Sequence, residues 1–273
     1  MVLVLGLAAP ALAGEWDVSG WKNQMAGAAV PSLANVAVRE VASTPFNAGP
    51  RPGNFDSYVL ALSWLPGFCS LHHTSECSSL TSAQFSANNL SLHGLWPDQS
   101  GDNQHNYGYC GVDPSVRQMG ENHAWCQMPS FGMSAGALND LSTYMPGTAS
   151  CLQNHEWYRH GSCSAMTPDN YFTAAAALTA KFAATAAGRF VSAHVGQTVQ
   201  ANDLLSAFES QFGAGSRKYV SLQCAKVGGN SALAEVHLVL ATPLQGTDFA
   251  KMLRPSPGGN CPASFTIPAA GSR

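Results

Sequence analysis

Two short segments of the sequence concentrate residue types that can perform acid–base chemistry. They are His93-Gly-Leu-Trp-Pro-Asp98 and His155-Glu-Trp-Tyr-Arg-His-Gly-Ser-Cys163. If the second segment is helical, residues four apart in it share one face. That face would present two imidazoles, one carboxylate and one guanidinium together, from His155, Glu156, Arg159 and His160.

This residue set departs from the common zinc motif. The H-E-x-x-H pattern of zinc peptidases requires a second histidine four residues after the first. Arg159 occupies that position after His155, and His160 lies one residue further along. A cation in place of a ligand repels a metal ion, so we expect no metal at this site. We expect no other cofactor either. A metal-dependent phosphoesterase that uses His155, Glu156 and His160 stays open as an alternative.

Metal-free cleavage of an RNA phosphodiester fits the same residues. RNA supplies its own nucleophile, the 2′-hydroxyl. Two histidines can remove the hydroxyl proton and protonate the leaving 5′-oxygen, because imidazole titrates near neutral pH. The guanidinium of Arg159 can bind phosphate oxygens in a bidentate manner, and Glu156 can hold a neighbouring imidazole in position.

The two segments resemble the active-site segments of the ribonuclease T2 family, secreted ribonucleases that need no metal. The segment 58–69, YVLALSWLPGFC, also resembles the first strand of that family, in particular of its bacterial, periplasmic branch. The resemblance covers about residues 55–265.

The resemblance implies three catalytic residues. His93 would bind phosphate or act as the general acid toward the leaving oxygen. His160 would be the general base for the 2′-hydroxyl, and Glu156 would be the acidic partner of the transition state.

The resemblance also implies four substrate-binding residues. His155 would bind phosphate, while Trp96, by stacking, and Asp98 would contact the base. Arg159 would bind phosphate too, although the family usually has lysine at this position, so a fork-shaped cation replaces a point charge. We expect His237, which lies in an apolar segment, to be an ordinary packing residue.

Eight cysteines with no C-x-x-C pair suggest four disulfides formed in an oxidising compartment. Spacing alone leaves 105 pairings open. The resemblance implies the disulfides Cys110–Cys163 and Cys224–Cys261. If Cys69 and Cys77 close a local loop, Cys126 and Cys151 remain as the fourth pair.

The elements that must position these residues follow an order typical of α+β proteins. We expect a central antiparallel β-sheet with helices packed beside it, stabilised by disulfides. The pattern predicts a strand at 58–64, a second strand at 90–93 that ends at Gly94, long loops over 97–132, helices at 133–144, 167–188 and 202–212, and strands at 218–223 and 233–241.

The length of 273 residues suits one catalytic domain, which we place at residues 53–273. Residues 1–13 are predicted to be a signal peptide, because the apolar run at 2–12 is too short to span a bilayer and ends in a small-residue cleavage pattern. Residues 14–52 are predicted to be an extended lead-in. We therefore expect a periplasmic or secreted protein with no membrane span.

The charge balance at first argues against a polyanionic substrate. Thirteen Lys and Arg face sixteen Asp and Glu, which gives a net charge of −3 with histidines neutral. The nine histidines would add positive charge on protonation, so we expect affinity for RNA to strengthen as the pH falls from about 7 toward 5.

The sequence thus predicts a monomeric endoribonuclease of low base specificity. It would cleave RNA by transphosphorylation to 2′,3′-cyclic phosphate and 5′-hydroxyl ends, with slower hydrolysis to the 3′-phosphate, and would leave DNA uncut. An inactive, ribonuclease-like binding or effector protein is the second alternative.

Overall fold

The computed structural model describes residues 50–72, 77, 80–99 and 107–271. The predicted signal peptide and almost all of the predicted lead-in lie outside these residues. Within them no helix is long and apolar enough to cross a membrane.

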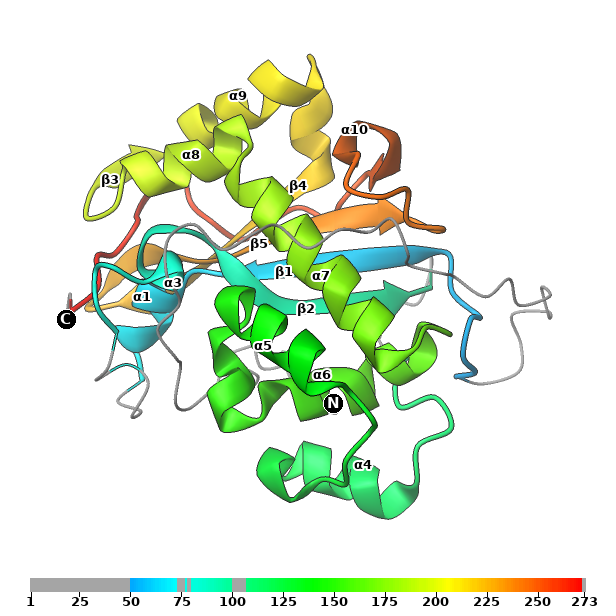
Figure 1. Ribbon diagram of the computed structural model, residues 1–273. Coiled ribbons are helices and arrows are strands. Elements are labelled where there is room, and N and C mark those ends of the chain that lie inside the picture. Colours follow the sequence, from blue (N-terminus) through cyan, green and yellow to red (C-terminus); the bar gives the residue numbers. More distant parts are fainter. Residues whose placement is uncertain (1–49, 73–76, 78–79, 100–106, 272–273) are drawn as a thin grey trace, which may run out of the picture.

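A seven-stranded sheet forms the centre of the molecule (Figure 1). Its order is β2-β1-β5-β7-β3, and β4 and β6 also pair with β5. All pairs are antiparallel except the contact between β5 and β7. The predicted α+β fold is therefore confirmed. The strands are β1 (Ser57–Ser63), β2 (Ser91–Asp98), β3 (Thr198–Gln200), β4 (Val220–Val227), β5 (Asn230–Ala241), β6 (Leu253–Arg254) and β7 (Ser264–Thr266).

Helices pack beside this sheet, and α7 crosses one of its faces (Figure 1). They are α1 (Leu65–Cys69), α3 (Phe85–Asn88), α4 (Pro114–Glu121), α5 (Ala135–Tyr144), α6 (Leu152–Arg159), α7 (Pro168–Ala183), α8 (Ala186–Ala193), α9 (Ala201–Phe212) and α10 (Phe249–Met252). The Thr167 side chain accepts a hydrogen bond from the backbone N–H of Asn170 and so caps α7. The predicted helix 167–188 was wrong only at its end, because α7 ends at Ala183 and Thr185 caps a separate helix, α8.

Residues 97–132 were predicted to be loops, which was wrong for part of the segment. Helix α4 begins at Pro114, and the Asp113 carboxylate accepts the backbone N–H of Ser115. An acidic N-cap residue followed by proline at the first helical position is a known signal for the start of a helix, so α4 could have been predicted from the sequence.

Alternation along the central strands separates a core face from a polar face. Leu60 and Leu62 of β1 pair with Leu238 and Val236 of β5, and all four are buried. Between them, His237 and other polar side chains of β5 point to the opposite face of the sheet, because successive strand residues alternate. The polar face is where the site described below lies.

An irregularity in β2 shapes the edge of this sheet. Ala61 pairs with Gly94 and Leu62 pairs with Leu92, so His93 is the extra residue of β2 at this irregularity. A bulge of this kind redirects a side chain. It also lets Leu92 and Leu95, three residues apart and both fully buried, face the same core. The predicted end of the strand at Gly94 was wrong, because β2 continues to Asp98.

Four disulfides connect the described residues, in the predicted pairs: Cys69–Cys77, Cys110–Cys163, Cys126–Cys151 and Cys224–Cys261. Cys110–Cys163 joins the segment after β2 to the segment after α6, and Cys126–Cys151 anchors the beginning of α6. Two disulfides therefore hold the helix that carries the second histidine segment.

Candidate active site

A pocket of about 260 Å³ opens on the polar face of the sheet. Its lining comes from β1, β2, β4 and β5, from the end of α6, and from the segment after β6. The lining residues are Val59, Trp96, Pro97, Asp98, Tyr107, Arg159, His160, Ser221, Gln223, His237, Val239, Ser256 and Pro257. Four of the residues predicted from the sequence thus line one cavity: Trp96, Asp98, Arg159 and His160.

His93 lies beside this pocket, between two carboxylates. Its Nδ1 is 2.7 Å from Oε1 of Glu235, and its Nε2 is 3.8 Å from Oε1 of Glu156. The ring is only 5% exposed. The bulge in β2 therefore places the imidazole where it meets acidic side chains from both α6 and β5.

Trp96 joins the two histidine segments. Its Nε1 donates a hydrogen bond of 2.9 Å to Oε2 of Glu156, and its ring stacks on His160 with 5.2 Å between the ring centroids. The edges of His93 and His237 also contact this ring system. One face of the indole is thus covered by His160. Trp96 holds the other site residues in place, in addition to lining the pocket.

Gly94 makes this close approach of α6 to β2 possible. A Cβ atom built on Gly94 would lie 1.9 Å from Oε2 of Glu156 and 2.2 Å from Nε1 of Trp96. The hydrogen bond between Trp96 and Glu156 therefore occupies the space that any larger residue would need.

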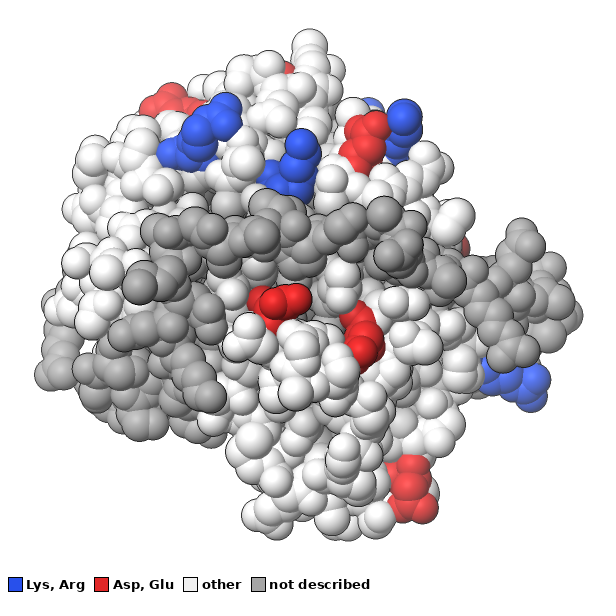
Figure 2. Space-filling model, viewed as in Figure 1, with Lys and Arg blue, Asp and Glu red and all other residues white. Residues whose placement is uncertain are grey.

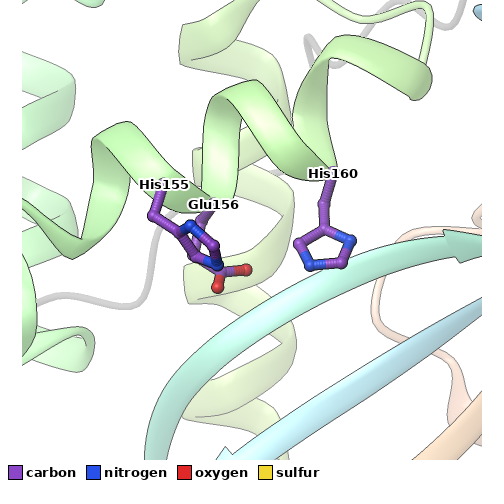
Figure 3. Close-up of side chains that lie close together, drawn as sticks. All are labelled: His155, Glu156 and His160. Atoms are coloured by element: carbon purple, nitrogen blue, oxygen red, sulfur yellow. The ribbon is translucent and has the colours of Figure 1, made fainter. Parts of the chain in front are cut away.

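Helix α6 presents His155 and Glu156, and His160 follows at its carboxyl end. Figure 3 shows the three side chains projecting from this helix toward β2. The predicted helix is confirmed, although it ends at Arg159 and His160 is its C-cap residue. One side-chain ligand atom from each of His155, Glu156 and His160 lies within 4.8 Å of the others. Such a group could hold a metal ion, which keeps the metal-dependent alternative chemically possible.

Aromatic contacts fix the remaining parts of α6. The His155 ring stacks on Trp125 at 4.8 Å between centroids. Trp157 packs against Phe131 and Tyr171.

Burial and a neighbouring cation determine the electrostatics of His155 and His160. Burial and then the Arg159 cation hold the pKa of His155 and the pKa of His160 well below the ordinary value. Both imidazoles are therefore neutral near pH 7 in the free protein. The positive charge that the pocket lining presents before RNA binds is therefore that of Arg159.

Sequence reasoning missed Glu235 and treated His237 as an ordinary packing residue. Oε2 of Glu235 lies 2.6 Å from Nε2 of His237, while its Oε1 contacts His93 and accepts a hydrogen bond from Ser63. Burial alone would raise the pKa of Glu235, but His93 and His237 together hold that pKa below its usual range. The available signal was an acid and a histidine two residues apart within an apolar strand, because such residues share one face.

The sequence also contains one G-x-S-x-G pattern, at residues 132–136, which marks the nucleophile in many serine hydrolases. Ser134 is exposed, and its Oγ accepts the backbone N–H of Ala137 as the cap of α5. This serine has a structural role at the start of a helix.

Solved structures similar to this chain include ribonucleases. The Nicotiana alata self-incompatibility-associated SF11-RNase matches with a TM-score of 0.54 and 20% identity, covering 79% of this chain and 98% of that one. A variant of RNase MC1, a protein of bitter gourd seeds, matches with a TM-score of 0.53 and 22% identity over 78% of this chain and 98% of that one. At this level of identity the likeness shows the fold.

Sequence comparison assigns the family. The model of the ribonuclease T2 family matches residues 55–252. Ribonuclease I of Escherichia coli is 32% identical over 268 residues, which is 87% of this chain and 97% of that protein. The chain belongs to the ribonuclease T2 family and is an endoribonuclease.

Proposed function

We propose that the protein cleaves RNA without a metal ion, by transphosphorylation to a 2′,3′-cyclic phosphate and a 5′-hydroxyl end. The observation that carries this proposal is the meeting of His93 and His160 around Trp96 and Glu156. Two imidazoles beside one pocket can act at the two ends of a single phosphoryl transfer.

His160 acts as the general base in the first step. Its low pKa keeps the ring neutral and able to accept the proton of the 2′-hydroxyl. The 2′-oxygen then bonds to phosphorus, the bond to the 5′-oxygen breaks, and His93 donates a proton to that leaving oxygen. His160 has gained a proton and His93 has lost one, and hydrolysis of the cyclic phosphate to the 3′-phosphate restores both.

The neighbouring groups bind the substrate and stabilise the transition state. Arg159 stabilises the charge on the phosphate oxygens, since a guanidinium offers parallel N–H donors. His155 adds a hydrogen bond to the phosphate, and Glu156 is the acidic partner of the transition state. Trp96 and Asp98 contact the base, with little preference for its identity. DNA is not cleaved, because it lacks the 2′-hydroxyl.

The proposal also includes the domain boundaries, the cellular location and the oligomeric state of the protein. Residues 1–13 are a signal peptide, 14–52 a lead-in and 53–273 the catalytic domain of a protein that functions in the periplasm or outside the cell. The four disulfides support this location, since disulfides persist in oxidising compartments. We propose that the protein acts as a monomer.

Digestion of RNA in excess EDTA tests the mechanism directly. We expect undiminished activity, 2′,3′-cyclic phosphate products at early times and 5′-hydroxyl ends throughout. Loss of activity with EDTA and its return with a divalent cation would instead favour the metal-dependent alternative at His155, Glu156 and His160. Cleavage to 5′-phosphate ends would contradict the proposal, and complete inactivity would favour the binding or effector alternative.

Binding of RNA should also depend on pH. On the face in Figure 2 the Lys and Arg side chains of the described residues are separated and form no continuous basic patch. At the pocket we expect local recognition, in which phosphate stabilises the protonated forms of His155 and His160. Their pKa values lie well below the ordinary range in the free protein, so the complex takes up protons and affinity rises as the pH falls from 7 toward 5.

The measurement uses an oligonucleotide with 2′-O-methyl riboses, which cannot be cleaved by this route. Affinity should rise by up to about tenfold per pH unit for each proton taken up. A His194→Gln variant is the matched control and should show the same slope, because His194 bonds to the Phe190 carbonyl on α8, away from the pocket lining. A flat profile would contradict this expectation.

A further inference from the structure

The buried carboxylate of Glu235 holds three donors on the polar face of the sheet. Its Oε1 lies 2.7 Å from Nδ1 of His93 and 2.8 Å from Oγ of Ser63, and its Oε2 lies 2.6 Å from Nε2 of His237. The side chain is 2% exposed. An ionised carboxylate is costly to bury unless such donors surround it, so its surroundings are arranged to keep it charged.

This arrangement fixes which nitrogen of each imidazole carries a proton. A carboxylate that stays ionised can only accept hydrogen bonds. Nδ1 of His93 and Nε2 of His237 must therefore both be protonated. Nε2 of His93 is the nitrogen left to face Glu156, 3.8 Å away.

The backbone explains why Glu235 can reach both rings. Glu235 and His237 are two residues apart on β5, so their side chains lie on the same face. Ser63 is the partner of Glu235 in the neighbouring strand β1, and His93 is the bulged residue of β2, one strand further. The side chain of Glu235, on the central strand β5, thus extends across β1 to His93 on the edge strand β2.

We propose that Glu235 is a positioning residue that sets the tautomer and the orientation of His93 for proton transfer to the leaving oxygen, with His237 as the second imidazole held by the same carboxylate. The inference rests on the proposed role of His93. Partners that orient metal-bound histidines typically affect activity by about 10–100-fold when they are removed, and we expect an effect of the same order for His93.

Substitution of Glu235 tests the role through kinetics. Glu235→Ala should lower kcat by about 10–100-fold with KM changed less than about twofold, because the substrate still binds while His93 is misplaced. Glu235→Gln should lose less, since its amide oxygen can still accept from His93. Glu121→Gln, on the exposed surface of α4, is the matched control and should retain full activity. A folded Glu235→Ala protein with unchanged kcat, or with raised KM alone, would overturn the proposal.

A measurement on the unsubstituted protein is independent of how well the variants fold. The ¹⁵N shifts of the His93 ring should show a protonated Nδ1 at each pH where the protein is folded. An unprotonated Nδ1 would overturn the inference. Because this result does not depend on activity, it separates failure of the Glu235 role from failure of the cleavage mechanism, which the EDTA digestion decides.

Discussion

Replacement of His160 by alanine is expected to lower the rate of RNA cleavage by about 10²–10⁴-fold, the usual contribution of a positioned acid or base. The neutral imidazole that would accept the 2′-hydroxyl proton is lost, while Arg159 stays in the pocket lining to bind phosphate. KM should therefore change less than kcat. The measurement is steady-state cleavage of a short RNA, with circular dichroism to confirm the fold.

The corresponding His93→Ala variant should show a loss of similar size. The double variant should be little worse than either single one, because the two groups act in one concerted proton transfer and their effects are not additive. His194→Ala serves as the control for removal of an imidazole outside the pocket. Retention of more than about one tenth of the activity by His160→Ala would contradict its role as general base.

Gly94→Ala is the second substitution with a large expected effect, although it touches no proposed catalytic atom of His93 or His160. The new methyl group would occupy the space of the hydrogen bond between Trp96 and Glu156. We expect at least about 100-fold lower kcat, since small displacements of catalytic groups have effects of this order. Crowding a packed interior should also lower the free energy of unfolding by about 1–3 kcal/mol.

Gly258→Ala is the matched control, because a Cβ atom at Gly258 meets nothing within 4 Å. It should leave both activity and thermal stability unchanged. Wild-type activity and stability in Gly94→Ala would show that α6 can move away from β2 without cost, which would contradict the tight contact described above.

The sequence indicated the order of the elements and the helix of the second segment well, because those features depend on local periodicity and capping. It failed at Gly94. A glycine inside a strand pattern was interpreted as its end, whereas the glycine is needed because another element approaches the backbone there. That approach comes from Glu156, which is distant in sequence, so no local pattern could reveal it.

The contacts of Glu235 could not be predicted from local sequence patterns either. His93 and Glu235 are separated by 142 positions and meet through the pairing of β2, β1 and β5. The alternation in β5 could have marked Glu235 and His237 as neighbours on one face. Their distance from His93 depends on strand order, which periodicity does not contain. Likewise, the low pKa of His160 follows from burial that only the packed molecule provides.

The position of β5 in the sheet has a consequence for the biosynthesis of the enzyme. This strand comes late in the chain, at Asn230–Ala241, yet it is central and pairs with β1, β4, β6 and β7. A nascent chain that ends before β5 contains both histidine segments but lacks the strand that supports them. The proposed active site can therefore form only after β5 has been synthesised, because Glu235 on this strand supports His93.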